Sequence, residues 1–469
     1  MTLDTLNILV VSHVDDNFGD NLIRICFGSI LSVVLKNLHL GGDRVAITYM
    51  ALKEIDETLV KHADIIAFAG GGLFGLSYLN FFDSLDRITV LAEEHDIPVI
   101  FSSIGINNMD ASPENEHKLQ AILQRKCIKA VSVRENLHIF KQYAGQCDYE
   151  ICKVCDPAVW TRYVYHKQLQ NVPSHQGELV GINVVRGGLF NDNGKQWKLG
   201  DEIVYLNELK KKLDDHGIPY RFYTNGSVLD DNALHFYADQ CDIPADHVIY
   251  SHTTRDLVQT VAQFDYVATV RMHSSIISYA LSIPSVNLIW NDKIPFFYRN
   301  IGYPDRAVEL AQWNGGHVFD LLQDIKNQSY TLDEEYLMSL YRYLYRVMNK
   351  LCQAGAKESD IFSFEEVKAA LCNSSVSPDE DSLDRELKIE KCEKHYLSRF
   401  KEIKQNDADL KRQKKELDKA TRALDKKTQE AQRLRSTLNK LSLLPSVFLL
   451  RAARKIYKTV VKQIQKAKA

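Results

Sequence analysis

Short apolar runs that alternate with helical patterns constrain residues 5–320 more than any other feature of the chain. The runs are apolar throughout, as in strands that are buried on both faces of a sheet. Strands of this kind, each followed by a helix, are typical of parallel sheets with helices on both faces. The strands predicted in the first set cover residues 7–12, 44–50, 65–69, 99–103, 130–133 and 153–155, with helices such as 22–36 and 81–95 between them.

The same pattern starts again after a polar segment at residues 165–177, which contains Pro173 and Gly177. We therefore place a linker there and expect an α/β chain with two doubly wound, Rossmann-like domains, at residues 1–165 and 178–330. Two such domains in series enclose a ligand cleft that faces the carboxyl ends of the strands. The strands predicted in the second set cover residues 178–185, 220–223, 247–250, 266–270 and 285–288, with a helix at 202–216.

The rest of the chain is predicted to be helical. Residues 331–371 have apolar side chains at helical spacing and form closing helices, and a polar hinge follows at 373–382. Residues 383–441 repeat one apolar position every seven residues, but the second heptad position is poor. This segment is either a weak coiled coil that pairs two copies of the chain or a single solvated helix. The repeated position holds Ile389, Tyr396, Ile403, Leu410, Leu417, Leu424, Ala431 and Leu438.

Charge is distributed unevenly along the chain. Residues 383–469 hold 25 Lys and Arg against 11 Asp and Glu, a net charge of +14. Because the whole chain has a net charge of −3, residues 1–382 carry −17. In a predicted helix at 445–466, apolar residues lie on one face and basic residues on the other. This pattern is typical of a helix that lies in an anionic membrane interface. A helix docked on the core or on a partner is the alternative, and the lack of interleaved aromatic residues argues against nucleic acid.

The sequence predicts a cytoplasmic chain that associates peripherally with the inner face of the cell membrane. Its first residues lack the basic region and apolar core of a signal peptide, and no stretch reaches the roughly 18 apolar residues of a membrane span. The nine cysteines are scattered, which indicates reduced thiols. Cys152 and Cys155 form one CxxC, without the second pair that a zinc ribbon needs.

Two motifs follow predicted strands of the first domain. A polar turn at residues 16–21 includes Asn17 and Asp20, and three glycines, Gly70, Gly71 and Gly72, follow the strand at 65–69. Glycines let the backbone approach a ligand closely and present N–H groups to an anion. The chain has neither a GxGxxG nor a Walker A motif. A helix-capping turn and a tight structural turn are the alternative interpretations.

Cationic side chains follow several other predicted strands. Arg271 and His273 are two residues apart, so both can point to the same side of an extended segment. Arg offers a planar fork for carboxylate or phosphate, and His can carry a proton near neutral pH. Lys293, Arg134 and Arg186 also follow strands. Their concentration in an acidic body predicts a compact and highly anionic ligand.

In order and spacing, these motifs resemble the polysaccharide pyruvyl transferase family over residues 5–320. The turn that begins at His13 has less glycine than is usual in the family, and the tail lies outside the resemblance. The matching segments are Asn17-Phe18-Gly19-Asp20, Gly70-Gly71-Gly72, Val133-Arg134-Glu135, Asp156-Pro157, Arg271-Met272-His273, Asp292-Lys293 and Ile301-Gly302.

The resemblance implies a fold similar to the glycosyltransferases with two Rossmann domains (GT-B-like). It implies transfer of a pyruvyl group from phosphoenolpyruvate to a sugar, with a cyclic ketal formed across two hydroxyls and phosphate released. The carboxylate and phosphate of phosphoenolpyruvate each suit an Arg or Lys partner. Neither a metal nor another cofactor is expected.

By matched position, the resemblance also implies roles for individual residues. His273, with Arg134 and Lys293, would be catalytic, and His273 would act as general acid–base. Phosphoenolpyruvate would bind in the second domain, at Arg271, Lys293 and Arg186. The first domain would face the acceptor through Asn17, Asp20, Gly70, Gly71 and Gly72.

The basic tail predicts an acceptor sugar carried on a membrane lipid, in the assembly of a capsule or exopolysaccharide repeat unit. Two other functions fit the same features. A glycosyltransferase of this architecture would bind the diphosphate of a nucleotide sugar with the same cations. A non-catalytic membrane-bound scaffold would recruit other enzymes of polysaccharide synthesis through its tail, and replacement of His273 would leave it intact.

Overall fold

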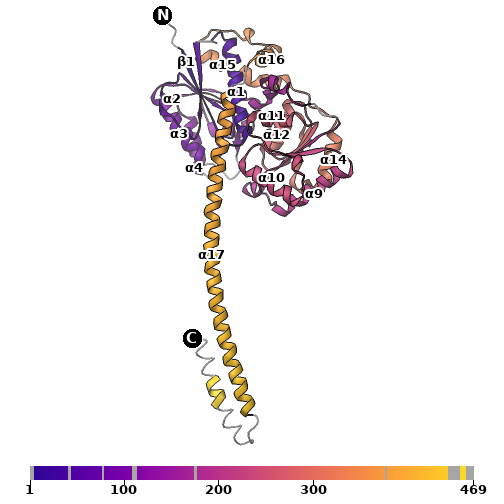
Figure 1. Ribbon diagram of the computed structural model, residues 1–469. Coiled ribbons are helices and arrows are strands. Elements are labelled where there is room, and N and C mark those ends of the chain that lie inside the picture. Colours follow the sequence, from indigo (N-terminus) through magenta and orange to yellow (C-terminus); the bar gives the residue numbers. More distant parts are fainter. Residues whose placement is uncertain are drawn as a thin grey trace. The chain divides into compact units, whose positions relative to one another are not determined.

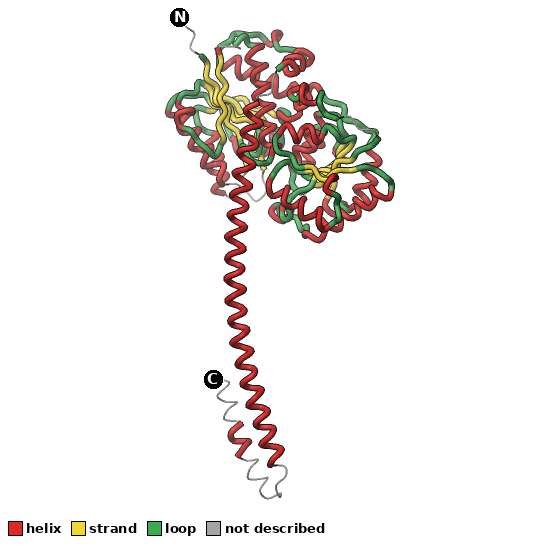
Figure 2. Tube along the Cα trace, viewed as in Figure 1, coloured by secondary structure: helices red, strands yellow, loops and turns green. Residues whose placement is uncertain are grey.

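The computed structural model describes residues 5–40, 44–75, 79–107, 113–173, 177–374, 378–441 and 455–460. It divides into two compact units, Met1–Cys392 and Glu393–Ala469. The first unit contains two parallel six-stranded sheets, each flanked by helices (Figures 1 and 2). These are the two Rossmann-like domains that the sequence predicts.

The first sheet has the strand order β2-β1-β3-β5-β7-β8, with all neighbours parallel. Its inner strands are apolar because helices cover both faces. The strands are β1 (Leu6–Ser12), β2 (Val45–Ala51), β3 (Ile65–Ala69), β5 (Val99–Ile104), β7 (Ile128–Val133) and β8 (Glu150–Lys153). The helices are α1 (Phe18–Asn37), α2 (Glu57–Lys61), α3 (Leu79–Glu94), α4 (Pro113–Leu123) and α5 (Leu137–Ala144).

The second sheet repeats this arrangement in the order β11-β10-β9-β12-β13-β14. Its strands are β9 (Val180–Asn183), β10 (Tyr220–Tyr223), β11 (Val248–Ile249), β12 (Tyr266–Thr269), β13 (Ser285–Ile289) and β14 (Ala307–Glu309). Its helices are α8 (Leu189–Asp192), α9 (Leu199–Asp215), α10 (Val228–Gln240), α11 (Thr254–Val261), α12 (Met272–Ala280), α13 (Lys293–Asn300) and α14 (Gly315–Ile325). Between the two sheets the chain forms η2 (Pro157–Trp160), α6 (Thr161–Val164) and α7 (His166–Leu169).

Three details differ from the sequence prediction. β8 ends at Lys153, so Cys155 lies beyond the strand predicted at 153–155. The edge strand β14 was not expected, because three residues are too short a pattern to detect. A pair of two-residue strands, β4 (Phe74–Gly75) and β6 (Ile106–Asn107), joins the segment after the three glycines to the segment after β5.

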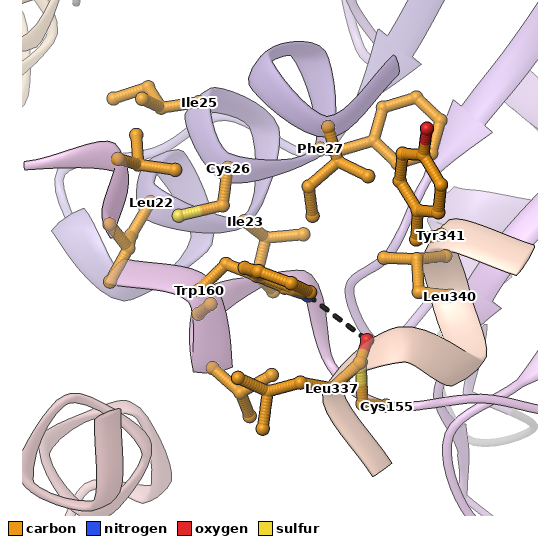
Figure 3. Packing of buried hydrophobic residues seen from close by; sticks show 14 of the residues in the cluster. Leu22, Ile23, Ile25, Cys26, Phe27, Cys155, Trp160, Leu337, Leu340 and Tyr341 are labelled. Atoms are coloured by element: carbon orange, nitrogen blue, oxygen red, sulfur yellow. Dashed lines mark hydrogen bonds between the residues drawn. The ribbon is translucent and has the colours of Figure 1, made fainter. Parts of the chain in front are cut away.

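Helix α1 forms the centre of the first unit. By length and composition it is the one helix among the described residues that could cross a membrane, but 83% of its apolar window is buried inside the fold. Its side chains pack on η2, α15 (Glu334–Leu351) and α16 (Phe364–Asn373). Figure 3 shows Ile23 and Phe27 of α1 beside Trp160 and Leu340. The apolar character of α1 is therefore that of a core helix.

The chain returns to the first domain after the second sheet. The Trp160 indole donates to the Leu337 carbonyl at 3.1 Å (Figure 3). The Tyr343 hydroxyl donates to the Phe101 carbonyl in β5 at 3.0 Å. The closing region predicted at 331–371 consists of two helices, α15 and α16, and Gly355 between them has φ +70°. This left-handed conformation favours glycine and lies in the turn between the two helices, after α15 has ended at Leu351.

Helix α17 covers Pro378–Leu441, in agreement with the long helix predicted for this region. Its residues up to Cys392 belong to the first compact unit and the later ones to the second. Leu410, Leu417 and Leu424 are 65–67% exposed, so the pairing of two copies stays a prediction. The basic helix predicted at 445–466 lies outside the described residues except for 455–460, which are helical.

Candidate functional site

A polar turn after β1 begins the site. Asn17 caps α1, because its side-chain oxygen accepts a hydrogen bond from the Gly19 N–H at 3.3 Å. The Phe18 N–H donates to the Asn225 carbonyl of the second domain at 3.0 Å. The helix-capping interpretation of this turn is therefore correct, and the same turn also joins the two domains.

His273 of the second domain lies directly on this turn. It is the second residue of α12, only 9% exposed, and it follows Arg271 at the end of the strand segment. A Cβ atom on Gly19 would stand 2.3 Å from His273 Nδ1 and 2.5 Å from Cγ. No other residue type than glycine fits this approach. His273 Nε2 is buried and has no hydrogen-bond partner in the part of the chain that the structure describes.

Lys293 makes the equivalent approach to the three glycines. It is the first residue of α13, and its Nζ lies 2.9 Å from the position that a Cβ on Gly72 would take. Gly70 and Gly71 have φ angles of +56° and +76°, which side chains disfavour. A Cβ on Gly70 would also stand 2.4 Å from Ile23 in α1. The glycines thus bend the chain after β3 and leave room for an ammonium group.

Arg134 is held between two carboxylates at the ends of β7 and β8. It is 5% exposed; its Nε donates to Glu135 Oε2 at 3.0 Å, and its Nη1 pairs with Asp156 Oδ2. Asp156 is itself fixed, because its other oxygen accepts the Ala158 N–H at 2.9 Å. A buried guanidinium with two buried partners keeps its charge and its orientation.

These groups act on one another electrostatically. Burial lowers the pKa of His273, and Arg134 and Lys293 lower it further, while Asp20 and Asp156 oppose the shift. Burial and Arg134 also lower the pKa of Lys293. Burial raises the pKa of Glu135, against the effect of the neighbouring cations. The site therefore favours a neutral imidazole beside the fixed Arg134 cation.

The structure consequently brings together residues that the resemblance assigns to different sides. His273, Arg134 and Lys293 were expected to be catalytic, with Lys293 also on the donor. The turn with Asn17 and Asp20 and the three glycines were expected to face the acceptor. Here, Gly19 of that turn lies against His273, and Gly72 lies against Lys293. One cluster, built from both domains, therefore combines backbone from the expected acceptor side with the expected catalytic groups.

Arg271 and Arg186 converge instead on Asp230, which is fully buried in α10. The Arg271 guanidinium donates two hydrogen bonds to this carboxylate, at 2.8 and 2.7 Å, and the backbone N–H of Arg186 donates a third at 2.9 Å. The Arg186 side chain pairs with Asp192 at the surface. An Asn183–Asn225–Ser274 hydrogen-bond network links this group to the His273 cluster.

Three carboxylates of the site had no assigned role in the sequence analysis. Glu135 and Asp156 lie inside motifs that carry the resemblance, so their place beside Arg134 was detectable there. Asp230 had no signal, because an acidic residue in the first turn of a helix is common. Within the described ranges, no group of three His, Cys, Asp or Glu side chains is placed to hold a metal ion. Burial raises the pKa values of Cys152 and Cys155 to about 12, which fits structural thiols.

A family model for polysaccharide pyruvyl transferases matches residues 8–292, more than half of the 469-residue chain. The chain belongs to the polysaccharide pyruvyl transferase family. The match contains Gly19, Gly72, Arg134 and His273 and ends one residue before Lys293. Comparison with curated proteins finds no match.

The solved structures to which this family member is similar include two proteins described as UDP-N-acetylglucosamine 2-epimerases. A protein assigned as a UDP-N-acetylglucosamine 2-epimerase from Listeria monocytogenes is 10% identical, with a TM-score of 0.50 over 74% of this chain and 97% of its own. The UDP-GlcNAc 2-epimerase of Methanocaldococcus jannaschii is also 10% identical, with a TM-score of 0.47 over 74% and 99%. At this identity the likeness concerns the fold alone, which is GT-B-like as expected.

Replacement of Gly19 tests whether the close approach to His273 matters in this pyruvyl transferase family member. Gly19→Ala places a methyl group 2.3 Å from His273 Nδ1, so the imidazole must move by about 1 Å. A misplacement of this size costs roughly 10²-fold in kcat. The measurement is kcat of the transferase reaction alongside the melting temperature. Gly200→Ala is the matched control, because nothing lies within 4 Å of its Cβ position. Equal kcat for both variants would contradict the prediction.

Proposed function

We propose that this protein transfers the pyruvyl group of phosphoenolpyruvate to two hydroxyls of a sugar. The product is a cyclic ketal, and phosphate is released. The observation that carries the proposal is the convergence of Arg134, His273 and Lys293 on glycine-lined backbone at the junction of two domains. Membership of the polysaccharide pyruvyl transferase family supports the transferase class and the pyruvyl group.

The cations suit the donor's two anionic groups. Arg134 is buried and fixed by its two carboxylates, and Lys293 is half-buried beside Gly72. In such surroundings a cation interacts with phosphate more strongly than it does in water. Arg134 offsets charge that develops on the leaving phosphate, and Lys293 binds the donor from the second domain. Because Glu135 and Asp156 orient Arg134 in advance, little reorganisation is needed during the reaction.

Arg271 and Arg186 complete the donor site in this proposal. Asp230 engages two of the five N–H groups of Arg271 and holds the planar guanidinium in one orientation. The remaining N–H groups suit the donor carboxylate. Arg186 is 31% exposed, so its contribution is that of a peripheral charge.

His273 moves the two protons that the reaction requires. The first sugar hydroxyl loses its proton to neutral His273 and bonds to C2 of the donor, while the imidazolium protonates C3 and converts the CH₂ group to CH₃. The second hydroxyl loses its proton to His273 and bonds to C2, the C2–O bond to phosphate breaks, and the phosphate receives that proton. Two C–O bonds form, one breaks, and both hydroxyl protons are accounted for. The unpartnered Nε2 is the atom available for these transfers.

A lipid-linked sugar at the cytoplasmic face of the membrane is the acceptor that the tail favours. Residues 441–469 contain seven basic residues and no acidic one. In the described part, Lys455 and Lys458 are exposed, whereas Ile456 and Val460 are less so. A basic amphipathic helix concentrates an enzyme at an anionic surface. Assembly of a capsule or exopolysaccharide repeat unit is the process that uses such acceptors.

Phosphate release from phosphoenolpyruvate with a panel of aryl-tagged and lipid-linked hexosides tests this function. We expect phosphate release and an acceptor mass gain that matches a ketal. We expect His273→Ala to lose 10²-fold or more of this turnover, as is typical of a general acid–base. His235→Ala is the matched control, because His235 is exposed on α10. Transfer from a nucleotide sugar instead would establish a glycosyltransferase. Full turnover by His273→Ala would contradict its acid–base role, and no turnover by the wild type together with intact polysaccharide synthesis in cells that carry His273→Ala would indicate a scaffold.

The pH dependence of kcat/KM tests the protonation state of His273. Proton abstraction requires the neutral imidazole, and burial together with Arg134 and Lys293 lowers the His273 pKa from 6.5. The loss of activity at acid pH should therefore have its midpoint below 6.5, because His273 stays neutral to lower pH than an ordinary histidine. Rates measured from pH 5 to 8 with saturating acceptor give the midpoint of this fall, the acid limb of the pH profile of kcat/KM. A midpoint above 6.5 would contradict a buried neutral base.

Vesicle sedimentation tests the role of the tail. Each basic residue near an anionic surface contributes about 1 kcal/mol, so Lys455→Gln with Lys458→Gln should weaken binding to phosphatidylglycerol vesicles by about 30-fold. Added salt should weaken wild-type binding as well. Lys61→Gln with Lys211→Gln removes two exposed lysines of the first unit and should have no effect. Unchanged binding by the tail variant would exclude electrostatic membrane attachment through these residues.

A further inference from the structure

The first turns of α17 lie within the fold, against both Rossmann-like domains (Figure 1). Asp384, Lys388 and Lys391 are four and three residues apart, so they lie on one face of the helix. Asp384 is 0% and Lys388 is 8% exposed. Charged side chains are rarely buried this far unless they are paired. Asp384 and Lys388 therefore need partners, and the two domains supply them.

Asp384 joins the two domains through one carboxylate. Its Oδ1 accepts a hydrogen bond from the Asn21 side chain in α1 at 2.7 Å. Its Oδ2 accepts the Thr254 N–H at the start of α11, also at 2.7 Å, and the Thr254 hydroxyl. Asn21 in turn donates to the Asp15 carbonyl at 2.9 Å. A residue of the tail helix thus fixes the turn after β1 to the second domain.

Lys388 makes the next connection. Its ammonium pairs with Asp231 of α10 at 2.7 Å and donates to the Ser251 carbonyl. The same ammonium lies 5.7 Å from the ring centroid of Phe18, the first residue of α1. Phe18 lies so close to Gly226 that a Cβ there would stand 2.1 Å from the ring. Lys388 therefore covers the contact of the turn with the second domain.

Lys391 completes the set. Its Nζ donates to Asp15 Oδ1 at 2.6 Å and lies 3.6 Å from Asp16 Oδ1. The other oxygen of Asp16 accepts the Val228 N–H, at the start of α10, at 2.8 Å. All three side chains of α17 thus contact residues 15–21 or the second-domain elements that this turn touches.

We propose that residues 384–391 are a third structural element of the active site. Asp384 and Lys388 are positioning residues: they act through the turn at 15–21, which places Gly19 against His273 and Asp20 near it. This inference deepens the proposed function, on which its kinetic part rests.

The chemistry of these contacts favours positioning over simple stabilisation. Buried charged pairs are costly to desolvate and add little net stability compared with apolar packing. Directional hydrogen bonds, in contrast, specify one geometry. Here, they meet at the one turn whose backbone must approach a catalytic imidazole without a side chain between them. Loosening of the turn would hydrate His273 and change its protonation, even in a folded protein.

Asp384→Ala in the full-length protein is the decisive variant, with Glu386→Ala as its matched control. Glu386 lies two residues further along α17 and is exposed. We expect Asp384→Ala to lower kcat 10- to 100-fold, with a much smaller change in KM for phosphoenolpyruvate. The acid limb of kcat/KM should also move to higher pH, because a hydrated His273 returns toward its ordinary pKa of 6.5. Wild-type kcat and an unmoved limb would overturn the proposal.

Hydrogen–deuterium exchange tests the same contact without any turnover. Peptides that cover residues 13–22 and 251–257 should exchange at least 10-fold faster in Asp384→Ala, whereas peptides from β3 and β12 should not change. Uniformly faster exchange would indicate general destabilisation and would overturn the positioning role. If no donor is turned over by the wild type, the proposed function fails, yet this exchange result still decides whether α17 orders the turn.

A pair of substitutions, tested singly and together, guards against a variant that fails to fold. Asp384→Asn keeps the shape of the side chain but puts an amide N–H₂ against one of the two donors, Asn21 or the Thr254 N–H, and Asn21→Ala removes the partner on α1. If the two side chains act through their hydrogen bond, the double variant Asp384→Asn with Asn21→Ala should lose less kcat than the two single losses combined. If the free-energy cost of the double variant, from kcat, equals the sum of the costs of the two single variants, the direct coupling of these residues is overturned.

Discussion

The site depends on how closely the second domain approaches the first at Gly19. The imidazole of His273 occupies the space in which any other residue would place its Cβ, and the ammonium of Lys293 has the same relation to Gly72. Backbone without side chains is what allows two separate domains to present their reactive groups at one point. The hydrogen bond from Phe18 to the Asn225 carbonyl fixes this approach from the side.

Around that contact, charged side chains are buried where water solvates them poorly. Arg134, Glu135 and Asp156 are all at most 5% exposed, and the desolvation of such a set is a cost to folding. Pairing of Arg134 with the two carboxylates offsets part of this cost. In the resulting environment the guanidinium stays charged and the imidazole stays neutral. These are the protonation states that the proposed reaction needs, for an anionic donor and for a hydroxyl that loses its proton.

Much of this arrangement could be predicted from the sequence, because apolar strand periodicity and the position of a motif at a strand end are local properties. Gly70–Gly72, Arg134, His273 and Lys293 were identified in that way. Asp230 and Asp384 could not be, because their roles arise from contacts with residues 41 and more than 100 positions away. For Asp384, the heptad repeat gave no indication either, because its apolar positions lie mostly in the solvent-exposed part of α17. The last strand of the first sheet was predicted at 153–155, but β8 covers Glu150–Lys153. Val154 and Cys155 misled the prediction because they are apolar and buried although they lie beyond the strand.

The burial of Asp384 and Lys388 has a consequence for how such chains can be recombined. A tail that began at the polar hinge could be exchanged between proteins as a detachable anchor. In this chain, the tail helix up to Cys392 belongs to the first compact unit, so a junction at the hinge would remove part of that unit. The boundary at which one tail can replace another lies beyond Cys392. Only the sequence after that point is free to diversify with the surface or assembly that the protein must reach.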